Sequence, residues 1–138
     1  MADPISLASG LIALTTFALQ SSKALYQTIQ SFQNNRKAIR DLREELEALD
    51  GVLQALTQTA TVTPTHLDAL KLPLYRCGTA CKDFKAIVVK CTAHSSGSRT
   101  SFRDWARLTY MGEDITGFRN MLAGYKSTIG IALGDANM

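Results

Sequence analysis

Apolar residues recur at alternating steps of three and four along almost the whole chain, and this spacing restricts the fold more than any other feature. Residues spaced in this way lie on one stripe of an α-helix, as the a and d positions of a heptad do. No segment shows the sustained alternation of apolar and polar residues that is typical of a strand. The pattern therefore predicts an all-α fold, a bundle of about four long helices plus one short helix.

Four stretches carry this spacing, and turn signals separate them. The first has one stripe of Leu7, Leu11, Leu14, Ala18, Leu25, Ile29 and Phe32, and beside it Ile5, Ile12, Leu19 and Tyr26. The second has Ile39, Leu42, Leu46, Leu49, Leu53 and Leu56, with a charged run from Arg36 to Glu47 on its other faces that reads as a solvated surface. The third has Leu67, Leu70, Leu74, Cys77, Cys81, Phe84, Val88 and Cys91, and the last has Ile115, Phe118, Leu122, Tyr125, Ile129 and Ala132.

The breaks between these stretches have recognisable causes. Thr63 before Pro64 suits an N-cap followed by proline at the first helical position. Pro73 predicts a kink or a restart of the third helix. Residues 95–101 are rich in Ser and Gly and predict a loop, after which Phe102, Trp105 and Leu108 mark the short helix. Gly112 predicts a stop before the last helix begins near Asp114.

The opening of the chain has no charged residue between Asp3 and Lys23. A secretory signal peptide would carry basic residues before its apolar core, and here the only early charge is acidic. As a helix, residues 4–22 would be ~28 Å long, against ~30 Å for the hydrocarbon core of a bilayer. A permanent span would nevertheless be poor, because seven polar side chains interrupt it, namely Ser6, Ser9, Thr15, Thr16, Gln20, Ser21 and Ser22. We therefore expect a helix that is stable either inside a bundle or in lipid.

Composition points to one domain over residues 1–138, with 46% hydrophobic and 20% charged residues. The net charge of +3 is unevenly distributed, since residues 1–60 carry five basic and six acidic side chains (net −1) and residues 61–138 carry ten and six (net +4). This imbalance is too weak for a dedicated nucleic-acid binder and favours anionic surfaces. An odd number of cysteines, three, favours a reducing intracellular compartment.

Candidate chemistry is sparse. Cys77, Cys81, Cys91 and His94 suggest zinc, but on one helix Cys81 and Cys91 would stand ~15 Å apart, whereas ligands lie within ~2.3 Å of one metal. Small core thiols are the interpretation we adopt. The stretch GYKST, residues 124–128, resembles the end of a phosphate-binding loop but lacks the glycine directly before its lysine. No catalytic constellation stands out, so we expect neither an enzyme nor a cofactor.

Two surface patterns have both a functional and a structural interpretation. Arg99, Arg103 and Arg107 form a stripe that would contact acidic lipid or a partner, or would simply be a solvated helix face. Ala2, Ser6 and Gly10 form a ridge of small residues that lets helices approach closely, in lipid or within a folded bundle.

Three segments resemble the HeLo-like N-terminal domain of fungal STAND proteins, the NOD-like receptors. They are the opening MADPISLASGLIAL, the stretch LYRCGTACKDF, and SFRDWARLTYMGEDITGFRNMLAGYKSTIGIAL. The resemblance spans residues 3 to about 133, and it is most specific from Trp105 to Thr128. It implies a helical bundle related to HeLo cell-death domains, which act as effectors when oligomerisation releases the N-terminal helix to permeabilise the plasma membrane.

Carried to this chain, the resemblance implies that the apolar segment 1–22 inserts in the membrane. Its inserting residues would be Pro4, Ile5, Leu7, Gly10, Leu11, Ile12, Leu14 and Phe17. The expected partners are anionic membrane lipids and further copies of the chain, with no nucleic acid. A nucleotide-binding, sensor or amyloid-signalling module is expected to follow in a longer protein. The domain would be cytoplasmic and would move to the plasma membrane when activated.

Two alternatives remain open from the sequence. The first is a non-lytic adaptor that only oligomerises or docks a partner domain, with its first helix permanently inside the bundle. The second is a lipid- or nucleotide-processing enzyme, against which the missing catalytic constellation argues.

Overall fold

The stretches with three-and-four spacing form the long helices of the computed structural model, which describes residues 4–30, 37–62, 64–93 and 114–136. These helices are α1 (Pro4–Gln30), α2 (Lys37–Val62), α3 (Lys71–Ala93) and α5 (Ile115–Ala136), and a 3-10 helix, η1 (Pro64–Leu70), precedes α3. No strand occurs in these residues, so the all-α prediction is confirmed. The expected loop 95–101 and the short helix with Trp105 lie outside the described residues.

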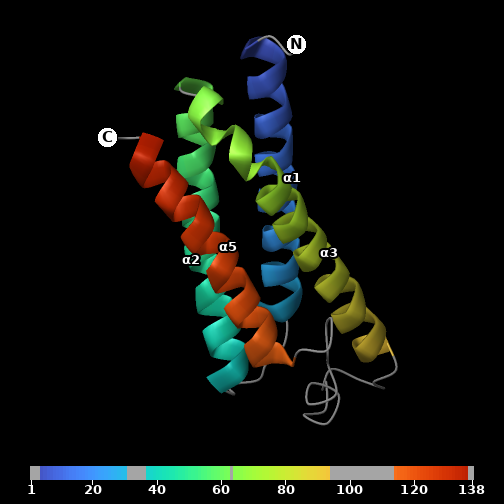
Figure 1. Ribbon diagram of the computed structural model, residues 1–138. Helices are drawn as coiled ribbons and strands as arrows, with labels where there is room; N and C mark the ends of the chain where they lie inside the picture. The colour runs from blue at the N-terminus through green and yellow to red at the C-terminus, as the bar shows by residue number, and fades with distance from the viewer. Residues whose placement is uncertain (1–3, 31–36, 63, 94–113, 137–138) are drawn as a thin grey trace.

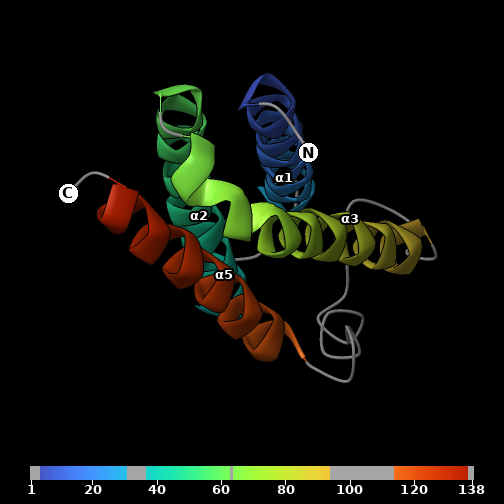
Figure 2. The same ribbon diagram turned by 45° about the horizontal axis from the view of Figure 1, so that its top comes forward.

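The long helices run alternately up and down, with α1 and α3 in one direction and α2 and α5 in the other (Figure 1). Helix α1 packs against α2 on one side and α3 on the other, while α5 packs chiefly against α2. The turned view of Figure 2 shows α2 and α3 on either side of α1. Helix η1 contacts all four of these helices. The arrangement places the N-terminal helix α1 between two neighbours.

Most of the core consists of residues that the spacing predicted, although Ala80 and Leu133 are buried as well and Leu14 of the α1 stripe is only half-buried. Every member of the α2 stripe, from Ile39 to Leu56, is buried, and so are the α3 stripe from Leu74 to Val88 and most of the α5 stripe. The rings of Phe84 on α3 and Phe118 on α5 stack with their centroids 4.1 Å apart. Each large apolar side chain buried here contributes roughly 1.5–3 kcal/mol to the stability of the bundle.

The helix break before Pro73 falls at Lys71 rather than at the proline. A proline inside a helix lacks the N–H that would bond to the carbonyl four residues earlier, and its ring collides with that carbonyl. Starting α3 at Lys71 places Pro73 in the first turn, where no such bond is required. The preceding residues Pro64–Leu70 form a 3-10 helix, so the α-helical geometry expected there was wrong.

The last helix begins as predicted, because Asp114 caps it. The Asp114 carboxylate accepts a hydrogen bond from the Gly117 N–H at 2.9 Å, and its carbonyl accepts one from the Phe118 N–H at 2.9 Å. An acidic cap of this kind satisfies an amide that the helix itself leaves without a partner.

The charged run on α2 is only partly a solvated surface. Glu45 pairs with Lys126 of α5 at 2.9 Å, and Asp41 pairs with Arg119 of α5 at 3.5 Å. Both carboxylates are partly covered by these contacts, with side-chain exposures of 16% and 25%. Ion pairs from this charged run therefore also join α2 to α5. The spacing of residues on a single helix does not predict such contacts between helices.

Candidate functional site

Helix α1, which carries no charge from Pro4 to Ser22, is the candidate functional element, and the structure packs it against α2 and α3. Leu11, Ala18, Leu25 and Ile29 are fully buried against the neighbouring helices. Of the predicted inserting residues, Leu11 is buried, and Gly10, Ile12, Leu14 and Phe17 are half-buried. The side chains of Pro4, Ile5 and Leu7 lie outside the described part of the chain. The described residues of the apolar face are therefore packed against protein in this conformation.

The described helices were compared with the length and hydropathy of membrane spans. None of them combines the length and the apolar character that a membrane span requires, and this includes α1.

The Phe17 ring of α1 packs into a notch above Gly78 of α3. A Cβ added at Gly78 would lie 2.5 Å from Cε2 and 2.6 Å from Cδ2 of the Phe17 ring, distances at which atoms overlap. Only glycine leaves room for the ring at that position. The same ring lies beside Tyr75 of α3, with the centroids 6.3 Å apart and the planes tilted by 31°. We call this contact the Phe17–Gly78 notch.

Gly10 has a less specific role than the ridge of small residues suggested. A Cβ at Gly10 would lie 3.6 Å from the Nζ of Lys71, which is an ordinary contact with the end of a flexible side chain. Lys71 itself pairs with Asp68 at 3.2 Å. Position 10 therefore does not require glycine, and the side chains of the other two ridge residues, Ala2 and Ser6, lie outside the described residues.

The polar side chains on the inner face of α1 bond to their own helix. The buried Thr15 hydroxyl donates to the Leu11 carbonyl at 2.8 Å, and the Ser22 hydroxyl donates to the Leu19 carbonyl at 3.0 Å. Thr28 likewise donates to the carbonyl of Ala24 at 2.9 Å. Because an unpaired buried hydroxyl is costly, these bonds let the helix bury its polar groups. Donor and acceptor lie on the same helix in each case, so none of these bonds is made to α2 or α3.

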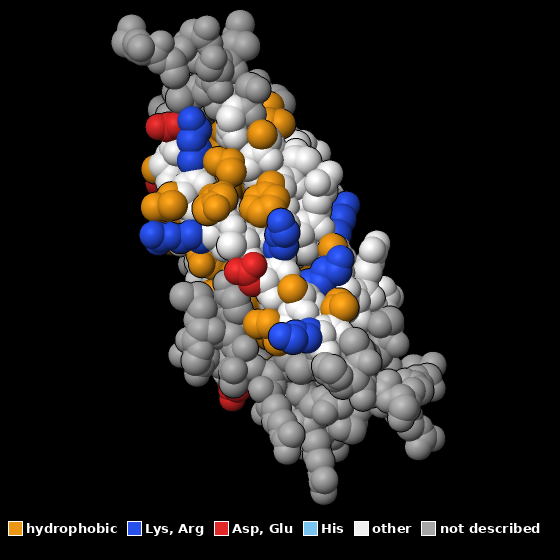
Figure 3. All heavy atoms as spheres, turned by 90° about the vertical axis from the view of Figure 1, so that its right-hand side faces the viewer, with side chains coloured by type: hydrophobic (Ala, Val, Ile, Leu, Met, Phe, Trp, Pro, Cys, Tyr) orange, Lys and Arg blue, Asp and Glu red, His pale blue; other side chains and the backbone are white. Residues whose placement is uncertain are grey.

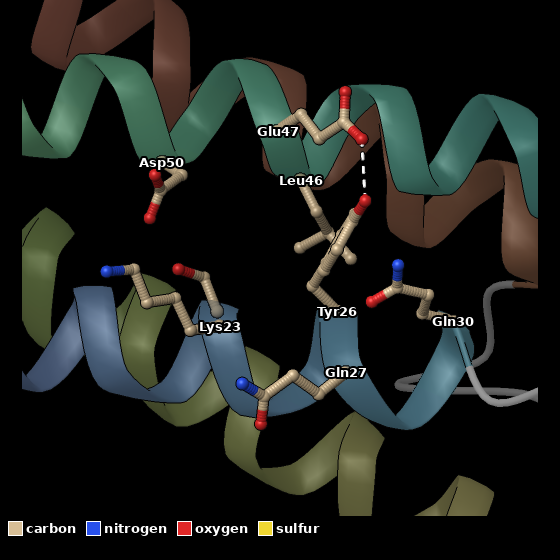
Figure 4. Close-up of a pocket in the computed structure, with 8 residues that line it drawn as sticks. Lys23, Tyr26, Gln27, Gln30, Leu46, Glu47 and Asp50 are labelled. Carbon is tan, nitrogen blue, oxygen red and sulfur yellow. Dashed lines mark hydrogen bonds between the residues drawn. The ribbon is translucent and has the colours of Figure 1, made fainter.

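A polar contact near the end of α1 joins it to α2. The Tyr26 hydroxyl donates to Oε1 of Glu47 at 2.7 Å, as the dashed line in Figure 4 marks. This hydrogen bond is the main reason that the pKa of Tyr26 lies above its ordinary value of 10.0; burial and the charge of Glu47 act in the same direction, and Arg43 opposes them. The bond is exposed, so it is weaker than the apolar contacts of α1.

An open groove of about 450 Å³ lies beside this contact, between α1 and α2. Figure 4 shows Lys23 on the α1 wall and Asp50 on the α2 wall. Gln54 donates to Oδ2 of Asp50 at 2.6 Å, whereas Oδ1 is covered and has no hydrogen-bond partner in the structure. The residues that line the groove are Ser22, Lys23, Tyr26, Gln27, Gln30, Leu46, Glu47 and Asp50. The α1–α2 interface is thus open and polar here, whereas α1 and α3 pack closely at the Phe17–Gly78 notch.

The predicted core thiols are confirmed for two of the three cysteines. Cys77 and Cys81 are buried and free. A hydrogen bond with Cys77, followed by burial, raises the pKa of Cys81 well above its usual 9.0, which keeps the thiol protonated and unreactive. The side chains of Cys91 and His94 lie outside the described residues. Within the described ones, no group of three or more His, Cys, Asp or Glu side chains is placed to hold a metal.

The stretch GYKST forms helix rather than a phosphate loop. It lies within α5, where the Thr128 hydroxyl bonds to the Gly124 carbonyl at 3.0 Å and Lys126 is paired with Glu45. Tyr125 is half-buried against the core, and burial is the main cause that raises its pKa. The stripe of Arg99, Arg103 and Arg107 lies outside the described residues.

Sequence reasoning missed Gly78 and the Tyr26–Glu47 bond. A glycine inside a helical pattern is a signal of close packing, and Gly78 carried that signal. Its partner, Phe17, is 61 positions earlier in the chain, and no spacing rule on one helix connects the two.

These features define a helical-bundle domain whose N-terminal helix, uncharged from Pro4 to Ser22, packs between two neighbouring helices. The sequence model of one family, described as pigment biosynthesis cluster protein PigL N-terminal, matches residues 2–138. The chain belongs to this family. Neither a curated protein nor a solved structure matches the chain.

Proposed function

We propose that this chain is a non-catalytic effector domain of the HeLo-like type, which permeabilises a membrane when it oligomerises and releases α1. Family membership supports a conserved N-terminal domain, and the resemblance of three segments to HeLo-like domains of fungal NOD-like receptors supports the cell-death role. In this proposal the resting domain is cytoplasmic. Its activated form lies at the plasma membrane, and its partners are anionic lipids and further copies of itself.

The observation that supports the proposal is that buried hydroxyl groups of α1 form their hydrogen bonds within α1 itself. From Pro4 to Ser22 the helix has no charge, and the hydroxyls of Thr15 and Ser22 are satisfied by its own carbonyls. Release therefore breaks apolar contacts with α2 and α3 but no hydrogen bond of these two residues. Lipid replaces the apolar contacts, and the backbone stays paired within the helix. Several copies must assemble, because one helix does not line a pore.

The test replaces Ala13, which is exposed in the bundle and stands at the midpoint of residues 4–22. Ala13→Asp leaves the core untouched, whereas on insertion scales it adds about 2.5–3.5 kcal/mol per copy near the bilayer centre. Ala48→Asp is the matched control, since Ala48 is also exposed but lies on α2. The assay is dye release from vesicles of phosphatidylcholine and phosphatidylserine at high protein-to-lipid ratio. We expect Ala13→Asp to abolish release and Ala48→Asp to preserve it.

Other substitutions on α1 are less suited to this test. Leu11→Glu would disrupt a fully buried position and unfold the bundle, so lost activity would have two causes. Ile12→Glu is better, because Ile12 is only half-buried. If folded Ala13→Asp and Ile12→Glu proteins both release dye like the parent, insertion of α1 is refuted.

The second candidate is a non-lytic adaptor domain. The observation that favours it is the Phe17–Gly78 notch, which fits α1 closely to α3. An adaptor would self-associate or bind a partner domain with α1 still packed. In that case the parent protein would assemble in the presence of vesicles without releasing dye.

A further inference from the structure

The outward face of α3 combines exposed apolar side chains with unpaired positive charge. Leu72, Tyr75 and Val89 are 55%, 54% and 47% exposed, although large apolar side chains are usually covered. The helix carries five basic residues, Lys71, Arg76, Lys82, Lys85 and Lys90, against one acidic residue, Asp83. Figure 3 shows orange apolar side chains interleaved with blue lysines and arginines on this side of the molecule, with fewer acidic side chains, in red, among them. We call the surface made by Leu72, Tyr75, Lys82, Lys85 and Val89 the α3 face.

A groove between α1 and α3 adjoins this face. It measures about 260 Å³, and its lining residues are Phe17, Gln20, Ser21, Ala24, Lys82 and Lys85. Two lysines and the polar Gln20 and Ser21 thus line the groove together with Phe17, and none of its lining residues is acidic. Such a set of donors beside an apolar ring fits a phosphate group attached to an apolar body.

Some basic residues outside α3 take part in ion pairs within the described bundle. Lys126 is paired with Glu45 at 2.9 Å, and Arg119 with Asp41 at 3.5 Å. Helix α2 carries three basic and five acidic residues, a net charge of −2, whereas α3 has +4. Within the described residues, Lys82 and Lys85 have no ion-pair partner, so their charge is available to an external anion.

We propose that the α3 face docks the folded domain onto an anionic phospholipid bilayer, with a lipid phosphate seated in the groove between Lys82 and Lys85. The exposed Leu72 and Val89 lie against the acyl boundary, and Tyr75 sits at the headgroup level, where aromatic side chains with a polar tip are favoured. Lysines suit this position because their stems cover apolar surface while the ammonium reaches the phosphates. The inference rests on the proposed function for its membrane target but concerns a different surface and an earlier step.

Docking on this face has a consequence for α1. Phe17 lines the lipid groove and also fills the notch above Gly78. A headgroup bound beside Phe17 therefore contacts the side chain that fastens α1 to α3. The docked bilayer would then lie next to the uncharged segment 4–22 of α1 before α1 leaves the bundle.

The test measures binding to vesicles apart from dye release. The double variant Lys82→Gln, Lys85→Gln should bind vesicles of phosphatidylcholine and phosphatidylserine about 25-fold more weakly than the parent, at about fivefold per charge. The control Lys37→Gln, Arg40→Gln removes the same charge from exposed positions on α2. It should stay within about threefold, since salt screens charges beyond ~8 Å from the lipid. Circular dichroism melts verify that both variants are folded.

Two further arms separate the bilayer from other ligands. Leu72→Gln with Val89→Gln should weaken vesicle binding without changing its salt dependence, because it removes apolar contact at constant charge. Titration with inorganic phosphate should give no saturable binding on its own. Saturable phosphate binding without vesicle binding would assign the groove to a soluble phosphate compound and overturn the docking proposal.

The outcomes distinguish docking from permeabilisation. Binding that depends on Lys82 and Lys85 without any dye release would support docking and refute the lytic function. Equal binding by the parent and the Lys82→Gln, Lys85→Gln variant would refute docking, whatever the dye release.

Discussion

Replacing Gly78 by alanine tests whether the Phe17 ring occupies the notch that seats α1. In an exposed helix interior, alanine stabilises by about 1 kcal/mol relative to glycine. At Gly78 the new methyl would overlap Cε2 and Cδ2 of Phe17, at 2.5 and 2.6 Å. Overpacking of this size costs about 1–3 kcal/mol. The two effects oppose each other, so we expect a net loss of about 0–2 kcal/mol, with the α1–α3 contact loosened.

Two other glycines provide the matched control. Gly51 on α2 and Gly130 on α5 are exposed helical positions, and a Cβ at either would have no neighbour within 4 Å. Alanine at each should raise the free energy of unfolding by about 1 kcal/mol. Urea unfolding followed by circular dichroism measures all three variants. Gly78→Ala should fall about 1–3 kcal/mol below the controls.

The double variant Phe17→Ala, Gly78→Ala isolates the contact itself. Once the ring is removed, Gly78→Ala should stabilise the protein as much as Gly51→Ala does, which gives a coupling free energy between the two positions. If Gly78→Ala already stabilises the parent as the controls do, Phe17 does not occupy the notch. The inferred seat of α1 would then be wrong.

Three further substitutions or conditions test the bundle. Tyr26→Phe removes the exposed bond to Glu47 and should lower the free energy of unfolding by about 0.5 kcal/mol, measured in urea. Because the pKa of Cys81 is raised in the folded state, the contribution of the Cys81 thiol to stability is present below pH 9.0 and is lost as pH rises above that value. The Cys81→Ala variant should therefore lose less stability than the parent between pH 8 and 10 in the same assay. An equal loss in the two proteins would contradict a raised pKa for Cys81. Leu46→Asp buries a charge on the core stripe and should leave the chain largely unfolded, since it costs several kcal/mol against a total of ~5–15 kcal/mol, whereas Ala48→Asp should give a folded helical spectrum.

The core stripes were predictable because burial on a long helix follows a local rule. Leu42, Leu46, Leu49 and Leu53 repeat at steps of three and four, and every one of them is buried. The same rule identified Cys77 and Cys81 as core thiols. Hydrophobic periodicity is a property of each helix by itself, so it needs no knowledge of which helices are neighbours.

Contacts between helices were not predictable in this way. The spacing predicts that Glu45 and Asp41 belong to a solvated surface, whereas in the structure they bind Lys126 and Arg119 of α5. Which acidic residue faces a lysine on another helix depends on how the helices pack and rotate, and a spacing rule carries no such information. The notch at Gly78 was missed for the same reason.

A disulfide between α1 and α3 tests most directly whether α1 must leave the bundle. A Cβ at Gly78 would lie 2.6 Å from Cδ2 of Phe17, and that atom is close to the Phe17 Cβ. Cysteines at the two positions therefore approach the Cβ separation of disulfides, about 3.5–4.5 Å. The single variants Phe17→Cys and Gly78→Cys, treated identically, control for pairing with native thiols.

The measurement is dye release from phosphatidylcholine and phosphatidylserine vesicles by the Phe17→Cys, Gly78→Cys protein, oxidised and then reduced. Release that is absent from the oxidised protein and restored by dithiothreitol is the result expected if α1 inserts. Equal release before and after reduction, with the cross-link verified by mass spectrometry, would contradict the release of α1 from its seat on α3.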